Sequence, residues 1–262
     1  MGTVKNKEKK VEAFLRLMEI MEDLRAACPW DMKQTWESLR HLTIEEVYEL
    51  GDAILDNDPE EVKKELGDIL LHLVFYAKIA EESKGFDLAD ALQHVCEKLI
   101  HRHPHIYGDV KVSNEEDVKA NWERLKLKEG AKGVLAGVPK SLPAMVKAQR
   151  IQEKARGVGF DWDHPHQVWG KVKEELEEFH QACEEQDEQA KMDELGDVLF
   201  SIINYARFVG LNPEEALERT NKKFIRRFQF MESKMQAEQL SWDQMNLESL
   251  DVFWNQAKKE GL

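Results

Sequence analysis

The stretch EEVYELGDAILDNDPEEVKKELGD, residues 45–68, returns in altered form as EELEEFHQACEEQDEQAKMDELGD at residues 174–197. Both stretches carry the pattern EExxE followed by ExxD, and all five acidic positions move by the same 129 residues. Positions three and four apart share one face of an α-helix, so each half of the pattern gathers its carboxylates on a single patch. The sequence therefore predicts two copies of one helical element, each with acidic patches on neighbouring helices.

Carboxylates stacked on one face repel each other mildly unless a cation lies among them. Patches made only of hard oxygen ligands suit Mg²⁺ or Mn²⁺. The alternative is a solvated helix face whose carboxylates pair with lysines, and Lys171 and Lys173 next to Glu174 are available for such pairs. The apolar stretches beside the acidic boxes and the repetition of the spacing favour a metal site in at least one copy.

Composition places the chain among soluble proteins. Its 262 residues suffice for one large domain or two smaller ones, with 42% hydrophobic and 34% charged residues. The net charge of −14 argues against nonspecific binding to nucleic acid, for which a basic stripe is expected. The three cysteines form no CxxC pair, and neither a signal core nor an apolar run of membrane length is present. We expect a cytoplasmic protein without membrane contact.

Apolar residues recur at helical spacing along most of the chain, which predicts an all-α fold. The expected helices cover residues 7–26, 43–56, 59–83, 87–102, 114–128, 144–155, 165–185, 187–209, 213–239 and 247–259. Thr43, Asp58-Pro59 and Asn212-Pro213 are typical helix starts. The glycine- and proline-containing segment 130–143 is the predicted linker. It separates an N-terminal domain, 1–129, from a C-terminal domain, 144–262.

The repeat extends beyond the acidic boxes. Three further segments pair up: CPWD (28–31) with FDWD (160–163), KLIHR (98–102) with KFIRR (223–227), and Trp122 with Trp254. Gly67 and Gly196 occupy the same place inside a predicted helix, where glycine costs about 1 kcal/mol relative to alanine. We expect a close approach of another helix or of the metal at both glycines.

Taken together, the motifs resemble those of a known family. EExxE followed by ExxD, with CPWDMKQT, ELGDILL, KLIHRHPHIYGDV, GFDW, ELGDVLF and TNKKFIRRF, is similar to the two-domain MazG nucleoside triphosphate pyrophosphohydrolases. The resemblance covers nearly the whole chain. It implies two tandem MazG-like helical bundle domains in a homodimer. It also implies Mg²⁺-dependent hydrolysis of NTPs and dNTPs, ATP among them, to nucleoside monophosphate and pyrophosphate, a reaction of nucleotide metabolism.

The resemblance also assigns roles to residues of the C-terminal domain. It implies catalytic roles for Glu174, Glu175 and Glu178; metal ligation by Glu175, Glu178, Glu194 and Asp197; and substrate binding by Lys191, Lys223, Arg227 and Trp254. Arg227 can grip phosphate with a bidentate fork, whereas Lys223 acts as a point charge. Lys191 is displaced by one position from the family pattern. The alternative is that the basic residues cover a helix surface and that Trp254 belongs to the core.

The N-terminal domain retains a possible metal set consisting of Glu46, Glu49, Glu65 and Asp68. It has fewer cations in the segment that matches TNKKFIRRF, so we expect a degenerate or regulatory domain. The HxHxH at 101–105 includes Pro104 at a predicted helix end and favours a loop over a zinc site. Cys28 is expected to be a packed thiol. No Walker A or GxGxxG sequence occurs.

Two other functions remain open. A helical binding protein could sense nucleotides without turnover, and a scaffold of amphipathic helices would show no dependence on metal.

Overall fold

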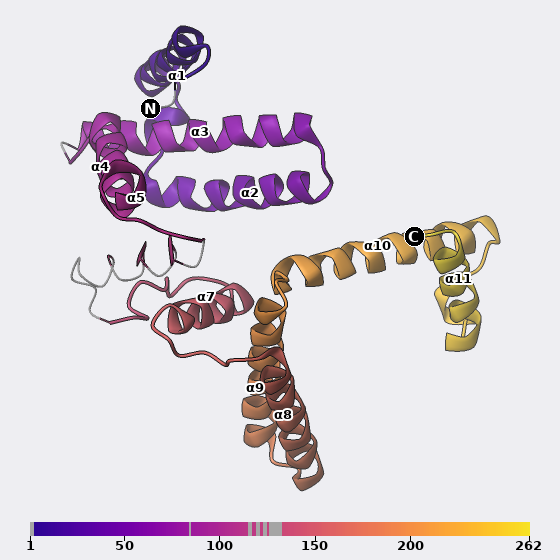
Figure 1. The fold of residues 1–262 in the computed structure, drawn as a ribbon. Coiled ribbons are helices and arrows are strands. Elements are labelled where there is room, and N and C mark those ends of the chain that lie inside the picture. Colours follow the sequence, from indigo (N-terminus) through magenta and orange to yellow (C-terminus); the bar gives the residue numbers. More distant parts are fainter. Residues whose placement is uncertain (1–2, 84, 115–116, 119–120, 123–124, 126–132) are drawn as a thin grey trace. The chain divides into compact units, whose positions relative to one another are not determined.

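The computed structural model describes the chain except for residues 1–2, 84, 115–116, 119–120, 123–124 and 126–132. Helices make up its regular structure, and no strand occurs among the described residues (Figure 1). The helices are α1 (Lys7–Ala27), α2 (Trp36–Leu55), α3 (Pro59–Glu82), α4 (Leu88–Arg102), α5 (Pro104–Tyr107), α7 (Ala144–Arg156), α8 (Pro165–Glu185), α9 (Glu188–Phe208), α10 (Pro213–Ala237) and α11 (Leu247–Lys259), with 3-10 turns η1 (Asp31–Lys33) and η2 (Trp242–Gln244). The all-α prediction is confirmed.

The described chain divides into two compact units, Met1–Lys111 and Val112–Leu262, which we call unit 1 and unit 2. Each unit contains one of the two acidic stretches. The predicted helix 114–128 and the start of the predicted linker fall largely outside the described residues. The exact limits of the two domains therefore remain predictions.

In unit 1, α2 and α3 lie side by side as a helical hairpin, and α1 and α4 both contact α3 (Figure 1). The core of unit 1 consists of Met21 from α1, Leu39 from α2, and Val74 and Phe75 from α3. Burying a large apolar side chain contributes about 1.5–3 kcal/mol, so this cluster fixes α1 over the C-terminal half of α3.

Helix starts in unit 1 depend on side-chain caps. Asp58 accepts hydrogen bonds from the backbone N–H groups at the start of α3, and Pro59 follows at the first helical position, as predicted. The predicted start of α2 at Thr43 is wrong. A capping box of Thr35 and Ser38 begins the helix, and Thr43 lies inside it, 2.7 Å from the Tyr76 hydroxyl on α3. The sequence TWES (35–38), with a threonine three residues before a serine, indicates this capping box.

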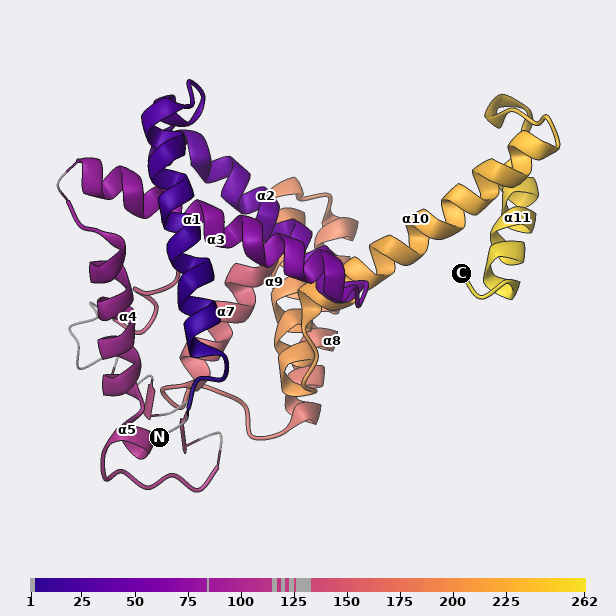
Figure 2. The same cartoon turned by 90° about the horizontal axis from the view of Figure 1, so that it is seen from above.

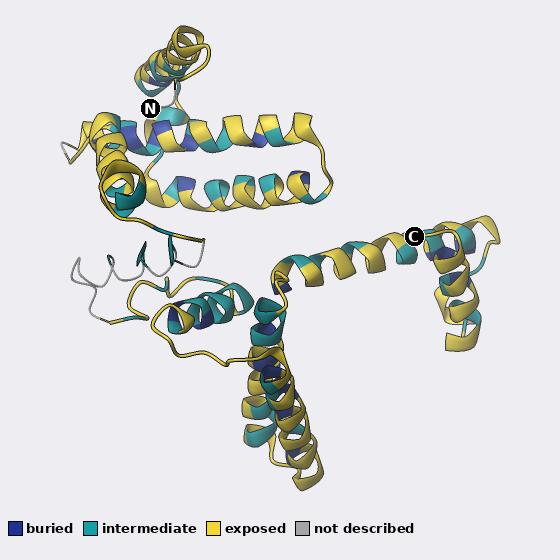
Figure 3. Cartoon of the chain, in the orientation of Figure 1, coloured by how far each residue is buried: buried dark blue, intermediate teal, exposed yellow. Residues whose placement is uncertain are grey.

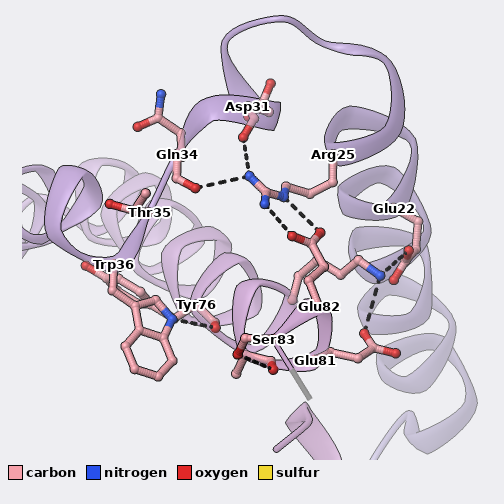
Figure 4. A network of polar contacts seen from close by, with 12 residues as sticks. Glu22, Arg25, Asp31, Gln34, Thr35, Trp36, Tyr76, Glu81, Glu82 and Ser83 are labelled. Carbon is pink, nitrogen blue, oxygen red and sulfur yellow. Dashed lines mark hydrogen bonds and ion pairs between the residues drawn. The ribbon is translucent and has the colours of Figure 1, made fainter. Parts of the chain in front are cut away.

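The CPWD segment is held in place by Arg25 at the end of α1 (Figure 4). Its guanidinium donates to the carbonyls of Asp31 and Gln34 and forms a bidentate pair with Glu82 at the end of α3. Arg25 therefore ties the loop that precedes α2 to the far end of α3. Trp36, the first residue of α2, adds a hydrogen bond of 3.1 Å from its indole N–H to the Tyr76 carbonyl.

Unit 2 contains a corresponding hairpin of α8 and α9, and α7 packs on α9. Gln152 of α7 donates a hydrogen bond of 2.8 Å to the Phe200 carbonyl of α9. Helix α10 begins at the predicted Asn212-Pro213 cap and pairs with α11 as a second hairpin (Figure 2). Met231, Met235 and Phe253 form the core of that hairpin.

Both acidic hairpins carry many exposed residues (Figure 3). Large apolar residues are among them. Four of them recur at the same spacing of 129 residues: Val47, Leu66, Leu70 and Leu73 in unit 1, and Leu176, Leu195, Leu199 and Ile202 in unit 2. All eight have relative exposures between 41% and 53%. We call these two sets the apolar faces of the hairpins. In the described part of the chain, no helix has the length and apolarity needed to span a bilayer.

The HxHxH segment is helical at its second half, where a loop was expected. Helix α4 ends at Arg102, His103 follows it, and the single turn α5 begins at Pro104. Proline suits this first helical position because the missing N–H needs no partner there. Among the described residues, no cluster of potential metal ligands includes these histidines.

Candidate active site and metal centre

The acidic site of unit 2 lies between α8 and α9. Helix α8 carries Glu175 and Glu178 one turn apart, and α9 carries Glu194 opposite them. Each of the three carboxylates places one oxygen within 4.8 Å of the others. We call this set the unit 2 cluster. Glu175 is buried at 6% exposure, whereas Glu178 is exposed, so the cluster opens to solvent on one side.

Two of the predicted acidic residues lie beside this cluster rather than in it. Asp197 follows Glu194 by one turn of α9 but is not among the three grouped carboxylates. Glu174 is exposed and accepts a hydrogen bond from Lys171 at 2.7 Å. The structure thus brings three of the five predicted acidic residues together and leaves the other two beside them, and the roles predicted for all five stay predictions.

Lys171 lies at the edge of the unit 2 cluster. From the sequence it was predicted only to be available for pairing with carboxylates of its own helix face. Its ammonium lies 2.7 Å from Glu174 and 2.7 Å from Glu175. Hydrogen bonding to Glu174 and then Glu175 raises the pKa of Lys171, so it stays charged. The signal was present in the sequence, because a lysine three and four residues before two glutamates faces both on a helix.

The carboxylates of unit 2 perturb one another. The pKa of Glu178 is raised, mainly by a hydrogen bond with Glu175 and then by desolvation. Repulsion from Glu175 and, more weakly, from Glu194 also raises this pKa, and the charge of Lys171 opposes the rise. A carboxylate that holds its proton more tightly near other carboxylates indicates an excess of negative charge at the site.

Unit 1 contains the matching arrangement between α2 and α3. Oxygens of Glu46, Glu49 and Glu65 lie within 4.8 Å of one another, and we call these residues the unit 1 cluster. Burial is the main cause that raises the pKa of Glu46, and Asp68 contributes repulsion from nearby. Lys64 lies 2.8 Å from Glu65 Oε1, and this hydrogen bond is the main cause that lowers the pKa of Glu65.

The donor atoms of both clusters fit a divalent cation. Glu65 is buried at 2% exposure, and its Oε2 has no hydrogen-bond partner among the described residues. Leaving a buried acceptor unsatisfied is unfavourable, and a bound cation would relieve this cost. All the grouped atoms are carboxylate oxygens, which are the preferred ligands of Mg²⁺ and Mn²⁺.

The contacts described for the predicted substrate-binding residues are made with groups outside the unit 2 cluster. Arg227 on α10 donates a 2.7 Å hydrogen bond to the Leu262 carbonyl, and its guanidinium lies 5.5 Å from the ring centre of Trp254 on α11. Lys191 pairs with Glu188 at 2.6 Å. Lys223 is exposed on α10. Within the described residues, no hydrogen bond or ion pair links these four to the cluster.

Trp254 belongs partly to the core, as the alternative interpretation held. It packs against the Met231, Met235 and Phe253 cluster, and its ring lies 5.0 Å from that of Phe224. Arg227 and Trp254 nevertheless form one contiguous pair on the α10–α11 hairpin, with a cation beside an aromatic face. Such a pair can bind a phosphate and a base together.

The glycines contradict one expectation. A Cβ atom added to Gly67 or Gly196 would meet nothing within 4 Å in the described chain. The predicted approach of another helix is therefore not met within the described chain, whereas an approach of the metal at these positions stays a prediction.

Two all-α units, each with carboxylates clustered inside a helical hairpin, define a protein with a duplicated acidic site. The family model described as the MazG nucleotide pyrophosphohydrolase domain matches residues 34–107 and 164–230, and thus both hairpins. This chain belongs to the MazG family of nucleotide pyrophosphohydrolases. The predicted tandem arrangement of two helical domains is confirmed.

Similar proteins cover nearly all of the chain. A protein of Escherichia coli K12 named nucleoside triphosphate pyrophosphohydrolase is 38% identical over 96% of this chain and 98% of its own length. A Thermotoga maritima protein named nucleoside triphosphate pyrophosphohydrolase/pyrophosphatase MazG is 42% identical over 94% of this chain and 95% of its own length. Bacillus subtilis YabN, named as uncharacterized, is 42% identical over 97% of this chain but only 53% of its own length.

A solved structure of a mazG-related protein from Thermotoga maritima is 34% identical. It aligns with 43% of this chain and 97% of its own chain, at a TM-score of 0.39.

Proposed function

We propose that the chain hydrolyses nucleoside triphosphates, in ribo or deoxy form, to the nucleoside monophosphate and pyrophosphate in the presence of Mg²⁺. The observation that carries this proposal is the unit 2 cluster, with three carboxylate oxygens within 4.8 Å and a lysine at its edge. Relatives of nearly the same length that are named nucleoside triphosphate pyrophosphohydrolases support it.

We assign binding of the cation to Glu175, Glu178 and Glu194, with Asp197 as a further oxygen ligand one turn away. A divalent cation at such a site neutralises triphosphate charge and lowers the pKa of bound water. Exposed Glu174 can accept a hydrogen bond from an incoming water and so hold it in position. Lys223 and Arg227 would hold phosphate oxygens, and Trp254 would contact the base, in an active site completed across the interface of a homodimer.

The direct experiment measures pyrophosphate release from ATP, GTP, CTP, UTP and their deoxy forms, with Mg²⁺ and with EDTA. We expect turnover that requires the metal, together with a rise of several degrees in the melting temperature when Mg²⁺ is added. Mn²⁺ should replace Mg²⁺. Nucleotide binding without pyrophosphate release would instead support a sensor, and turnover in EDTA would exclude the proposed metal role.

A homodimer completes the proposal. The two apolar faces expose eight large side chains at matching positions, and a two-fold axis lets such a face cover a copy of itself. Pairing would also supply the second half that a two-helix hairpin needs to become a four-helix bundle. Light scattering at micromolar concentration should give the mass of two 30.5 kDa chains. An active protein with the mass of one chain would refute this.

The remaining proposals concern location and partners. The cysteines are free, which agrees with a reducing cytoplasm, and cell fractionation tests that location.

The net charge of −14 supports a small triphosphate as the partner rather than nucleic acid. Filter binding to DNA and RNA at physiological salt should therefore show no retention.

A further inference from the structure

The two clusters contain the same carboxylates but different cationic side chains. Lys171 of unit 2 corresponds, at the spacing of 129 residues, to Leu42 of unit 1. Lys64 of unit 1 corresponds in the same way to Asp193 of unit 2. Each unit therefore neutralises its acidic cluster from a different helix, α8 in unit 2 and α3 in unit 1.

Lys171 lies against the unit 2 cluster itself. Its ammonium is within 2.7 Å of the buried Glu175, a member of the cluster, and equally close to the neighbouring Glu174. The charge of Lys171 also acts on Glu178, whose pKa it lowers against the larger effects of Glu175 and desolvation. One ammonium thus offsets the charge of several carboxylates that a divalent cation would otherwise neutralise.

Lys64 is placed differently. It contacts Glu65 through Oε1 at 2.8 Å and reaches outward to Glu61 at 3.3 Å. The other oxygen of Glu65, Oε2, is buried and has no hydrogen-bond partner among the described residues. A cation can therefore use this oxygen while Lys64 remains where it is.

We propose that Lys171 is a displaceable counter-ion of the unit 2 cluster, which holds Glu175 until a divalent cation and a triphosphate bind. This inference rests on the proposed function, because it concerns how that site takes up its metal and substrate. The cation competes with the ammonium for Glu175, so the metal alone binds weakly to unit 2. A triphosphate gives the released ammonium a new anionic partner, so cation and substrate bind cooperatively there. Lys171 is a positioning residue in this scheme.

The alternative is an ordinary pair of helix contacts at spacings of three and four residues. Such pairs stabilise a helix slightly and do nothing else. Removing Lys171 would then lower the melting temperature a little and leave the affinity for metal unchanged. The affinity for metal alone therefore distinguishes the two cases without any measurement of turnover.

The test titrates Mn²⁺ alone into full-length protein and follows the free ion by its electron paramagnetic resonance signal. A background of Glu49→Gln and Glu65→Gln silences unit 1 so that only unit 2 is observed. We expect Lys171→Leu to bind Mn²⁺ about three- to tenfold more tightly than the background. Lys171→Arg, which keeps the charge, and Lys173→Leu, on the same helix, should match the background.

Cooperativity gives a second readout. A triphosphate analogue with a methylene bridge between the α and β phosphorus atoms should tighten Mn²⁺ binding in the background protein. We expect Lys171→Leu to lose most of this gain. Unchanged or weaker Mn²⁺ binding by Lys171→Leu in the absence of nucleotide would overturn the inference while leaving the proposed function intact. A background protein that binds no Mn²⁺ would overturn both.

Unit 1 offers the reverse experiment, which does not depend on the folding of a Lys171 variant. With unit 2 silenced by Glu178→Gln and Glu194→Gln, Leu42→Lys installs the missing lysine beside Glu45 and Glu46. We expect Mn²⁺ to bind several-fold more weakly than to the same background with Leu42. Equal affinities would contradict the proposed competition.

Discussion

Unit 1 and unit 2 have the same acidic hairpin but differ in the groups around it. In unit 2 the segment KFIRR supplies Lys223, Arg226 and Arg227, whereas the matching segment of unit 1 supplies Lys98, His101 and Arg102. The carboxylate geometry is alike, since both clusters place three oxygens within 4.8 Å. Because the metal ligands match, they give no reason to prefer either unit as the catalytic one. Our proposal of unit 2 depends instead on the cations that would hold a triphosphate.

The largest expected effect comes from removing one central carboxylate in each unit. Glu178→Gln should lower pyrophosphate release by at least about a hundredfold, because a loss of 2.7 kcal/mol or more of transition-state stabilisation is expected from a broken metal site. Glu49→Gln, at the matching position of unit 1, should retain most of the activity. The two variants are assayed side by side at saturating Mg²⁺. The reverse ranking would place catalysis in unit 1.

The second comparison concerns the basic groups. Arg227→Ala should raise KM and lower kcat/KM by about tenfold or more, because the bidentate guanidinium is lost from the phosphate. Arg102→Ala in unit 1 should change neither constant appreciably. Because Arg227 also donates to the Leu262 carbonyl, the melting temperature must be measured too. A loss of stability with unchanged kinetics would mean that Arg227 only anchors the C-terminus.

The sequence predicted the hairpins well because their determinants are local. Asp58-Pro59 and Asn212-Pro213 cap their helices where expected, and the spacing of the acidic boxes gave both clusters. The start of α2 predicted at Thr43 was wrong because threonine, a common helix cap, can also lie inside a helix. There its hydroxyl contacts the Tyr76 hydroxyl of another helix. The position of Arg227 relative to the cluster could not be predicted, since it depends on how α10 leaves α9 rather than on any local pattern.

A third comparison concerns the loops that precede the two hairpins. In unit 1, Arg25 of α1 binds the CPWD segment and Glu82 at the end of α3. In unit 2 the arginine is at the end of α9 instead, where Arg207 forms a bidentate pair with Asp161 of FDWD at 3.0 and 2.5 Å. Both arrangements fix the start of the first hairpin helix against the end of the second.

Removing either arginine should therefore destabilise its own unit. Arg25→Met and Arg207→Met each lose charge-assisted hydrogen bonds from a largely buried guanidinium, at a cost of about 1–3 kcal/mol measured by urea unfolding. Activity should fall only with Arg207→Met, because only unit 2 is catalytic in our proposal. Loss of activity with Arg25→Met at a temperature where the protein is folded would contradict that division.

The Arg25 pair also predicts a dependence on pH. Hydrogen bonding to Arg25 is the main cause that lowers the pKa of Glu82 below its ordinary value. This contribution is fully present above the unfolded-state pKa of Glu82 and is lost as pH falls through the lower folded-state value. The stability difference between wild type and Arg25→Met should therefore shrink as the pH is lowered below about 4. A constant difference would show that the carbonyl contacts alone account for it.

The smallest expected effect is at the two glycines. Gly67 and Gly196 lie inside α3 and α9 with open space around them, so alanine should fit and should stabilise each helix by about 1 kcal/mol in an isolated chain. The proposed dimer changes this expectation, because a partner helix packed closely at the glycine would collide with the new methyl group. Gly196→Ala should then weaken association and activity, whereas Gly67→Ala reports on the same contact in unit 1. Light scattering measures the association of both variants, and urea unfolding measures their stability. Stabilisation of about 1 kcal/mol with unchanged mass and turnover would show that no partner helix approaches these glycines.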